Sequence, residues 1–169
     1  MTEARAHIAP VSAHDIERLR ALAAEIWRRH YSSIISAAQI EYMLNQRYDA
    51  QLIRAELERP GLWWDKLVVM GEMIGFASYF LTANAGEMKL DKLYVRPDHQ
   101  RKGYAGMFLD HIVGVAHNLG CTSLALTVNR KNASAIAAYH KHGFRIAGPL
   151  VTDIGEGYVM DDHLMIKDL

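Results

Sequence analysis

The sequence has little cysteine and no clear set of metal ligands. Cys121 is its one cysteine, so an internal disulfide is excluded. The nine histidines are scattered without the short spacing typical of ligand pairs, and we therefore expect no metal. A lone cysteine is typical of a reducing compartment, which predicts a cytoplasmic protein.

Net charge and long apolar runs are also missing. Nineteen basic side chains balance nineteen acidic ones, so we expect neither nucleic acid nor a membrane as a partner. No apolar run approaches membrane-spanning length, and the first residues lack the layout of a secretion signal. Half of the residues are apolar, which is enough for one well-buried core, so we expect a single domain over residues 1–169.

The hydrophobic pattern predicts an α+β fold in which helices cover a mixed sheet. Ser36 and Asp49 are expected to cap the second and third helices, and Asn132 the last one. The apolar residues of the first helix fall on one face: Ile16, Leu19, Leu22, Ala23, Ile26 and Trp27. The expected helices are 15–30, 36–44, 49–59, 104–120 and 132–143, and the expected strands are 6–11, 67–70, 74–81, 88–95, 124–128, 144–147 and 158–166.

The turn over residues 93–106 is the most informative segment of the chain. Pro97 ends a strand and a helix begins near Tyr104, so the amides of 101–106 have no acceptor within that helix. They form the positive end of the helix dipole, and Gly103 allows phosphate oxygens to approach closely. Basic side chains add charge around it: Arg96, Arg101 and Lys102. The turn therefore predicts a diphosphate site.

Two common phosphate-binding motifs do not match this turn. Its glycines are not spaced as in the dinucleotide-binding fingerprint, and the Gly-Lys-Ser/Thr of a phosphate-binding loop is absent. A structural alternative is that Gly103 and Gly106 only allow the helix to pack close to a strand.

Residues 100–105 resemble the Gln/Arg-x-x-Gly-x-Gly/Ala pyrophosphate motif of the GNAT superfamily of acetyl-coenzyme A-dependent N-acetyltransferases. Residues 126–144 are similar to its second core motif, a strand followed by Asn-x-x-Ala, Tyr and Gly-Phe. The resemblance covers about residues 66–166, the expected cofactor-binding core, with helices over 13–60 covering the acceptor side. It implies a GNAT-like domain with a mixed, mostly antiparallel sheet, in which the parallel strands ending at Val95 and Val128 splay apart.

The resemblance implies that acetyl-coenzyme A is the cosubstrate. The main chain of Leu93 and Val95 would pair with the pantetheine arm, and Asn132 would contact the cofactor from the second motif. The cofactor-binding residues that it implies are Leu93, Tyr94, Val95, Gln100, Arg101, Lys102, Gly103, Tyr104, Ala105, Gly106, Asn132 and Tyr139.

The implied reaction is direct attack of a neutral amine on the thioester, with a main-chain N–H near Leu93 stabilising the oxyanion. Tyr139 would donate a proton to the leaving thiolate, because a tyrosine with a pKa of about 10 is protonated at neutral pH; the alternative is an ordinary packing residue. Some relatives carry a glutamate base where this chain has Lys89. Asp91 is a substitute, acting through water, and its alternative is a surface carboxylate paired with Lys89 or Arg96.

The acceptor is expected to be a small amine, with polyamines among the candidates. Trp27 and Tyr31 could face its cation, although burial explains these aromatic residues equally well. Asp161 and Asp162 lie in a segment similar to bacterial polyamine acetyltransferases, with turn formation and capping as the alternative. A protein N-terminal or lysine acetyltransferase and a non-catalytic coenzyme A-binding regulatory module remain open, as does a homodimer.

Overall fold

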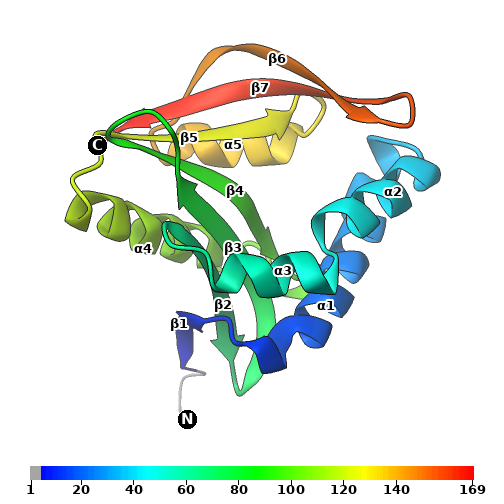
Figure 1. Cartoon of the computed structure of the whole chain (residues 1–169), viewed down its shortest axis with the longest axis horizontal. Coiled ribbons are helices and arrows are strands. Elements are labelled where there is room, and N and C mark those ends of the chain that lie inside the picture. Colours follow the sequence, from blue (N-terminus) through cyan, green and yellow to red (C-terminus); the bar gives the residue numbers. More distant parts are fainter. Residues whose placement is uncertain (1–4) are drawn as a thin grey trace. The chain divides into compact units, whose positions relative to one another are not determined.

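The computed structural model describes residues 5–169 and has the α+β architecture expected from the sequence (Figure 1). The described strands are β1 (Ala6–Pro10), β2 (Leu62–Val69), β3 (Glu72–Leu81), β4 (Glu87–Val95), β5 (Ser123–Asn129), β6 (Arg145–Gly155) and β7 (Tyr158–Asp168). The described α-helices are α1 (Ile16–His30), α2 (Ala37–Arg47), α3 (Ala50–Leu57), α4 (Tyr104–Asn118) and α5 (Ala133–Lys141). The strands form one mixed sheet in the order β1-β2-β3-β4-β5-β7-β6, as expected for a GNAT-like fold.

The chain divides into two compact units. The first unit contains the described residues up to Tyr79 and Lys92–Phe108, and the second contains Phe80–Asp91 and Leu109–Leu169. The loop over residues 96–106, which the sequence predicts to bind the cofactor and which is called the cofactor loop below, therefore belongs to the first unit, and Tyr139 belongs to the second.

In the first unit, local signals place the helices as predicted. All six apolar residues of the predicted face of α1 are buried, and α1 contacts both α2 and α3. The Ser36 side chain accepts a hydrogen bond from the Gln39 amide at 3.1 Å, and Asp49 accepts one from the Leu52 amide at 3.0 Å. Both N-caps are confirmed, because each satisfies a helical N–H that has no acceptor inside its own helix.

Strand β2 begins at Leu62, earlier than the expected Leu67, so Trp63 and Trp64 lie in a strand. Asp65 and Lys66 interrupt the apolar pattern there and hide the strand in the sequence. Asp65 is nevertheless buried, and the Tyr79 hydroxyl donates a 2.6 Å hydrogen bond to it. Burial and the adjacent Asp65 carboxylate raise the pKa of Tyr79 well above its usual range, so this hydroxyl stays protonated.

In the second unit, β5 lies between β4 and β7 and pairs with both. It pairs in parallel with β4 over Glu87–Leu90 and Ser123–Leu126, and antiparallel with β7 over its whole length. The parallel ladder ends before either strand does, since β4 continues to Val95 and β5 to Asn129. This is the region in which the resemblance predicts the two strands to separate.

Strands β6 and β7 form a long antiparallel hairpin, drawn in orange and red in Figure 1. The expected strand 144–147 is too short, because β6 runs from Arg145 to Gly155. Pro149 and the largely exposed side chains of β6 conceal it in the sequence. A proline is tolerated here because β6 is the last strand of the sheet order and pairs on one side. No helix in the described part of the chain is long and apolar enough to span a membrane.

Candidate active site

The loop after β4 is held at its start by main-chain and side-chain hydrogen bonds. The Arg96 amide donates to the Ile74 carbonyl at 2.8 Å, which keeps the end of β4 beside β3. A 3₁₀ turn over Pro97–His99 follows. Gln100, one of the residues expected to contact the cofactor, donates a 3.1 Å hydrogen bond from its side-chain amide to the Val95 carbonyl. Its side chain therefore closes the loop onto the end of the strand.

The following residues form an open main-chain cradle at the place where the sequence predicts a diphosphate site. Arg101 and Gly103 have φ of +61° and +82°, which turns the chain before α4 begins. A Cβ added at Gly103 would meet no heavy atom within 4 Å, so space lies open beside the main chain. Among the described residues at the start of α4, Met107 is the first whose amide donates to a main-chain carbonyl, that of Gly103 at 3.1 Å. The preceding amides are thus available to an anion, as the sequence predicts.

The positive charge around the cradle differs from the expectation for Arg96. Arg101 and Lys102 are exposed, but the Arg96 guanidinium contacts Glu72 and Asp98, each at 2.7 Å. The hydrogen bond from Arg96, with a second from His99, holds the pKa of Asp98 well below its usual range. The charge of Arg96 is therefore balanced by two carboxylates, and it adds little to the field at the loop.

The strand residues that precede the loop present main chain and side chain to different surroundings. The Tyr94 hydroxyl lies 3.1 Å from the Tyr31 hydroxyl, and burial raises the pKa of Tyr94 well above its usual value. A Cβ at Gly75 would lie 2.8 Å from the Tyr94 carbonyl, so only glycine allows β3 to approach here. The Tyr94 side chain packs among aromatic rings and its carbonyl faces β3, so the predicted pantetheine contact stays with the main chain of Leu93 and Val95.

The aromatic residues expected to face an amine form a cluster within the first unit. The Trp27 ring is 2% exposed, with its centroid 4.4 Å from that of Tyr31 and 5.9 Å from that of Tyr94. Its indole N–H donates to the Tyr48 hydroxyl at 3.2 Å. Trp27 is thus a core residue, and a ligand would have to displace neighbouring rings to reach its face.

The buried ammonium of Lys92, which the sequence analysis missed, lies over the aromatic rings of Tyr48 and Trp64. Lys92 is 4% exposed, and its ammonium lies 4.9 Å from the ring centroid of Trp64 and 5.6 Å from that of Tyr48. Such cation–π contacts stabilise a buried ammonium. Alternation along β4 places Lys92 on the face of Met88 and Leu90, and a lysine in that apolar series was the available signal.

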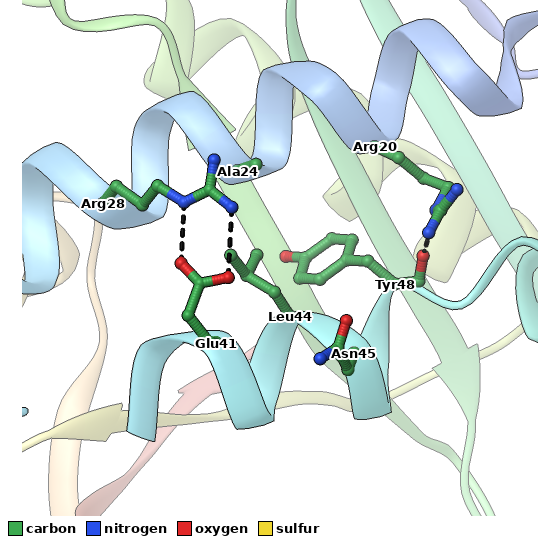
Figure 2. Close-up of a pocket in the computed structure, with 7 residues that line it drawn as sticks. All are labelled: Arg20, Ala24, Arg28, Glu41, Leu44, Asn45 and Tyr48. Atoms are coloured by element: carbon green, nitrogen blue, oxygen red, sulfur yellow. Dashed lines mark hydrogen bonds and ion pairs between the residues drawn. The ribbon is translucent and has the colours of Figure 1, made fainter. Parts of the chain in front are cut away.

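A small surface pocket of about 110 Å³ lies between α1 and α2 (Figure 2). Its charged side chains already have partners: Arg28 makes two hydrogen bonds to Glu41, and Arg20 donates to the Tyr48 carbonyl at 2.8 Å. The lining residues are Arg20, Ala24, Arg28, Glu41, Leu44, Asn45 and Tyr48. None of the predicted site residues lines this pocket.

In the second unit, α5 carries the residues of the second motif. Asn132 stands at the N-cap position, but its side chain makes no capping hydrogen bond, so the capping role expected from the sequence is wrong. The side chain is 5% exposed, and its carbonyl accepts from the Ser134 hydroxyl at 3.4 Å. The half-buried Tyr139 packs its ring edge against Phe144, with centroids 5.5 Å apart.

Asp161 and Asp162 both lie inside β7, where they pair with Val151 and Leu150 of β6. The alternative that they form a turn before the strand is therefore wrong. Asp161 is mostly exposed and lies 3.5 Å from the Arg130 guanidinium, whereas Asp162 is 3% exposed. Alternation along the strand thus directs one carboxylate outward and the other inward.

Asp91 also belongs to the second unit and is half-buried on β4. Of the two basic residues considered as partners for Asp91, Arg96 forms its ion pairs with Glu72 and Asp98, and the Lys89 ammonium lies 6.0 Å from the Phe80 ring centroid.

Among the described residues, no group of histidine, cysteine and acidic side chains has the arrangement of a metal site.

Comparison with known proteins finds similarity along most of the chain. Residues 17–144 match the Acetyltransferase (GNAT) family. A spermidine N(1)-acetyltransferase of Thermoplasma acidophilum is 27% identical over 158 residues, which cover 91% of this chain and 94% of that protein. A ribosomal protein bS18-alanine N-acetyltransferase of Salmonella typhimurium is 39% identical over 61 residues, 36% of this chain and 41% of that protein.

Solved structures share the fold over the whole chain. The crystal structure of a PaiA N-acetyltransferase from Thermoplasma acidophilum, in complex with coenzyme A, superposes with a TM-score of 0.85 at 23% identity. The match covers 98% of this chain and 99% of that one.

Proposed function

This chain belongs to the acetyltransferase (GNAT) family and is an acetyl-coenzyme A-dependent N-acetyltransferase, and we propose that its acceptor is a small-molecule amine of the polyamine class. The observation that carries the proposal is the similarity to a spermidine N(1)-acetyltransferase along 91% of the chain. The similarities to protein-directed relatives cover 36% and 48% of the chain. The first match therefore extends over a much larger part of the chain than the others do.

On the donor side, the amides of 101–106 would hold the diphosphate of acetyl-coenzyme A. The unpaired amides, the positive φ of Gly103 and the exposed charges of Arg101 and Lys102 support this role. The main chain of Leu93 and Val95 would bind the pantetheine arm, and Asn132 of the second motif would contact the donor. The Val95 carbonyl already accepts from Gln100, which orients it.

For the transfer itself, acetyl-coenzyme A supplies an activated thioester carbonyl. A main-chain N–H near Leu93 would stabilise the negative charge that develops on the carbonyl oxygen. Asp91 would accept the proton lost by the attacking amine, through a water molecule. Tyr139 would donate a proton to the sulfur as the carbon–sulfur bond breaks and the carbon–nitrogen bond forms.

For the acceptor, Asp162 is the stronger of the two carboxylate candidates. Its side chain is withdrawn from bulk water. A charged hydrogen bond to an ammonium is stronger in such a buried environment than at the surface. Asp161 is already paired with Arg130 and is largely exposed, so it would contribute less.

The test is release of free thiol from acetyl-coenzyme A with three acceptors at equal concentration. Spermidine, propylamine and an alanine-initiated peptide separate a polyamine, a plain amine and a protein N-terminus. We expect the highest kcat/KM with spermidine. A peptide that outperforms spermidine would replace this proposal with the protein-directed alternative.

A further inference from the structure

The Arg96 side chain connects the start of β3 to the 3₁₀ turn that precedes the cofactor loop. Its guanidinium donates to Glu72 at the first residue of β3 and to Asp98 in the 3₁₀ turn, each at 2.7 Å. The arginine side chain is 15% exposed, whereas the two carboxylates remain more than half exposed. A planar guanidinium can satisfy two carboxylates at once in a fixed geometry, which a lysine ammonium does less well.

The loop beyond Asp98 requires such support. Arg101 adopts a φ of +61°, a conformation that is unfavourable for a residue with a side chain. Strained backbone persists only where its surroundings hold it in place. The contacts of Arg96 and Gln100 provide this restraint, because the Arg96 amide, the Arg96 side chain and the Gln100 side chain each fix one part of the loop.

We infer that the Glu72–Arg96–Asp98 bridge positions the diphosphate-binding loop, and that Arg96 is a positioning residue for acetyl-coenzyme A rather than a phosphate ligand. This inference rests on acetyl-coenzyme A binding at residues 100–106, as proposed above. The depressed pKa values of Glu72 and Asp98, caused first by their hydrogen bonds from Arg96, agree with a bridge that is charged at neutral pH.

The two roles of Arg96 predict effects of opposite sign. If Arg96 bound phosphate directly, removal of Asp98 would release the guanidinium and delete a negative charge near an anionic ligand, and KM for acetyl-coenzyme A would fall. If the bridge positions the loop, the same removal disorders the amides and KM rises. The sign of the change therefore identifies the role.

The experiment measures KM for acetyl-coenzyme A and kcat at saturating donor for Arg96→Lys, Asp98→Ala and the double variant. We expect each single variant to raise KM about three- to tenfold and to leave kcat within about twofold, as for loss of a partly exposed charged hydrogen bond. The KM of the double variant should be no higher than that of the more impaired single variant, because both changes break the same bridge. Arg145→Lys alters an exposed pair with Asp168 at 2.9 Å and should leave both constants unchanged.

A wild-type KM in Arg96→Lys, or a lowered KM in Asp98→Ala, overturns the inference. Asp98 is an exposed side chain, so Asp98→Ala keeps the test valid if Arg96→Lys does not fold. Gly103→Ala separates the two proposals: if it also leaves KM unchanged, the location of the diphosphate site is wrong. If Gly103→Ala raises KM and both bridge variants do not, only the role of Arg96 is wrong.

Discussion

Replacing Gly103 by alanine tests the cofactor loop through a single methyl group. Gly103 has a φ of +82°, and no heavy atom lies within 4 Å of the position that a Cβ would take. The substitution therefore creates no clash inside the protein. Its two expected effects are backbone strain and occupation of the space in which the diphosphate is predicted to lie.

The strain can be estimated from the backbone conformation. An L-residue in the left-handed region is less stable by about 1–2 kcal/mol, and each 1 kcal/mol lowers the melting temperature of a chain of this size by about 2–4 °C. We therefore expect Gly103→Ala to lower the melting temperature by about 2–8 °C. Displacement of the donor should weaken its binding by about tenfold or more, equivalent to about 1.4 kcal/mol.

Gly120 is a matched control for the strain. It has a φ of +75° with no heavy atom within 4 Å of a Cβ, and it follows α4 rather than preceding it. Gly120→Ala should lower the melting temperature by a similar amount without changing donor affinity. Gly114→Ala, in the interior of α4 and also without a close neighbour, should raise the melting temperature, because alanine favours the helix.

The assays are thermal unfolding without ligand and calorimetric titration with acetyl-coenzyme A. If Gly103→Ala and Gly120→Ala lose the same stability and both bind the donor with wild-type affinity, the diphosphate site is not at this loop. If Gly103→Ala loses affinity and Gly120→Ala does not, the loop binds the donor as proposed.

Three further predictions address the chemistry and the fold. Tyr139→Phe keeps the ring that packs on Phe144 but removes the proton donor, so single-turnover rates should fall about ten- to a thousandfold with donor affinity nearly unchanged; an unchanged rate contradicts the assignment. Asp162→Asn should raise KM for spermidine more than Asp161→Asn does, with KM for acetyl-coenzyme A as the internal control. A wild-type KM for spermidine in both variants would exclude these carboxylates. Burial alone would raise the pKa of Asp15, but hydrogen bonds from Lys66 and Ser12 outweigh it and lower the pKa, so stability from this group is present above pH 3.8 and is lost as pH falls through the lower folded value. The difference in urea midpoint between the wild type and Asp15→Asn should therefore be constant well above pH 3.8 and shrink as the pH falls below 3.8, and a difference that does not shrink would contradict the pairing.

Much of the helical structure could be predicted because its signals are local. The apolar residues of α1 recur with helical spacing, and the same six side chains are buried in the structure. Ser36 and Asp49 cap their helices through amides three positions along the chain. The strands were less predictable, since Asp65 in β2 is acceptable in the interior only through Tyr79, fourteen positions away.

The candidate site shows the same division between local and distant determinants. The sequence by itself predicted an anion-binding loop, because free helix-start amides, small residues and basic side chains are all specified within residues 96–106. It also determined the family, through two motifs whose residue types and order are visible in the chain.

Only the tertiary structure decided how individual charges are used. Arg96 is basic in the sequence, but Glu72, twenty-four positions earlier, takes part of its hydrogen-bonding capacity and changes it from an expected phosphate neighbour to a support for the loop. Lys92 is buried only because Trp64 and Tyr48, from a strand and a helix C-terminus, lie against its ammonium. Electrostatic roles depend on which groups share a desolvated environment, and residues distant in the chain come to share one only when the chain has folded.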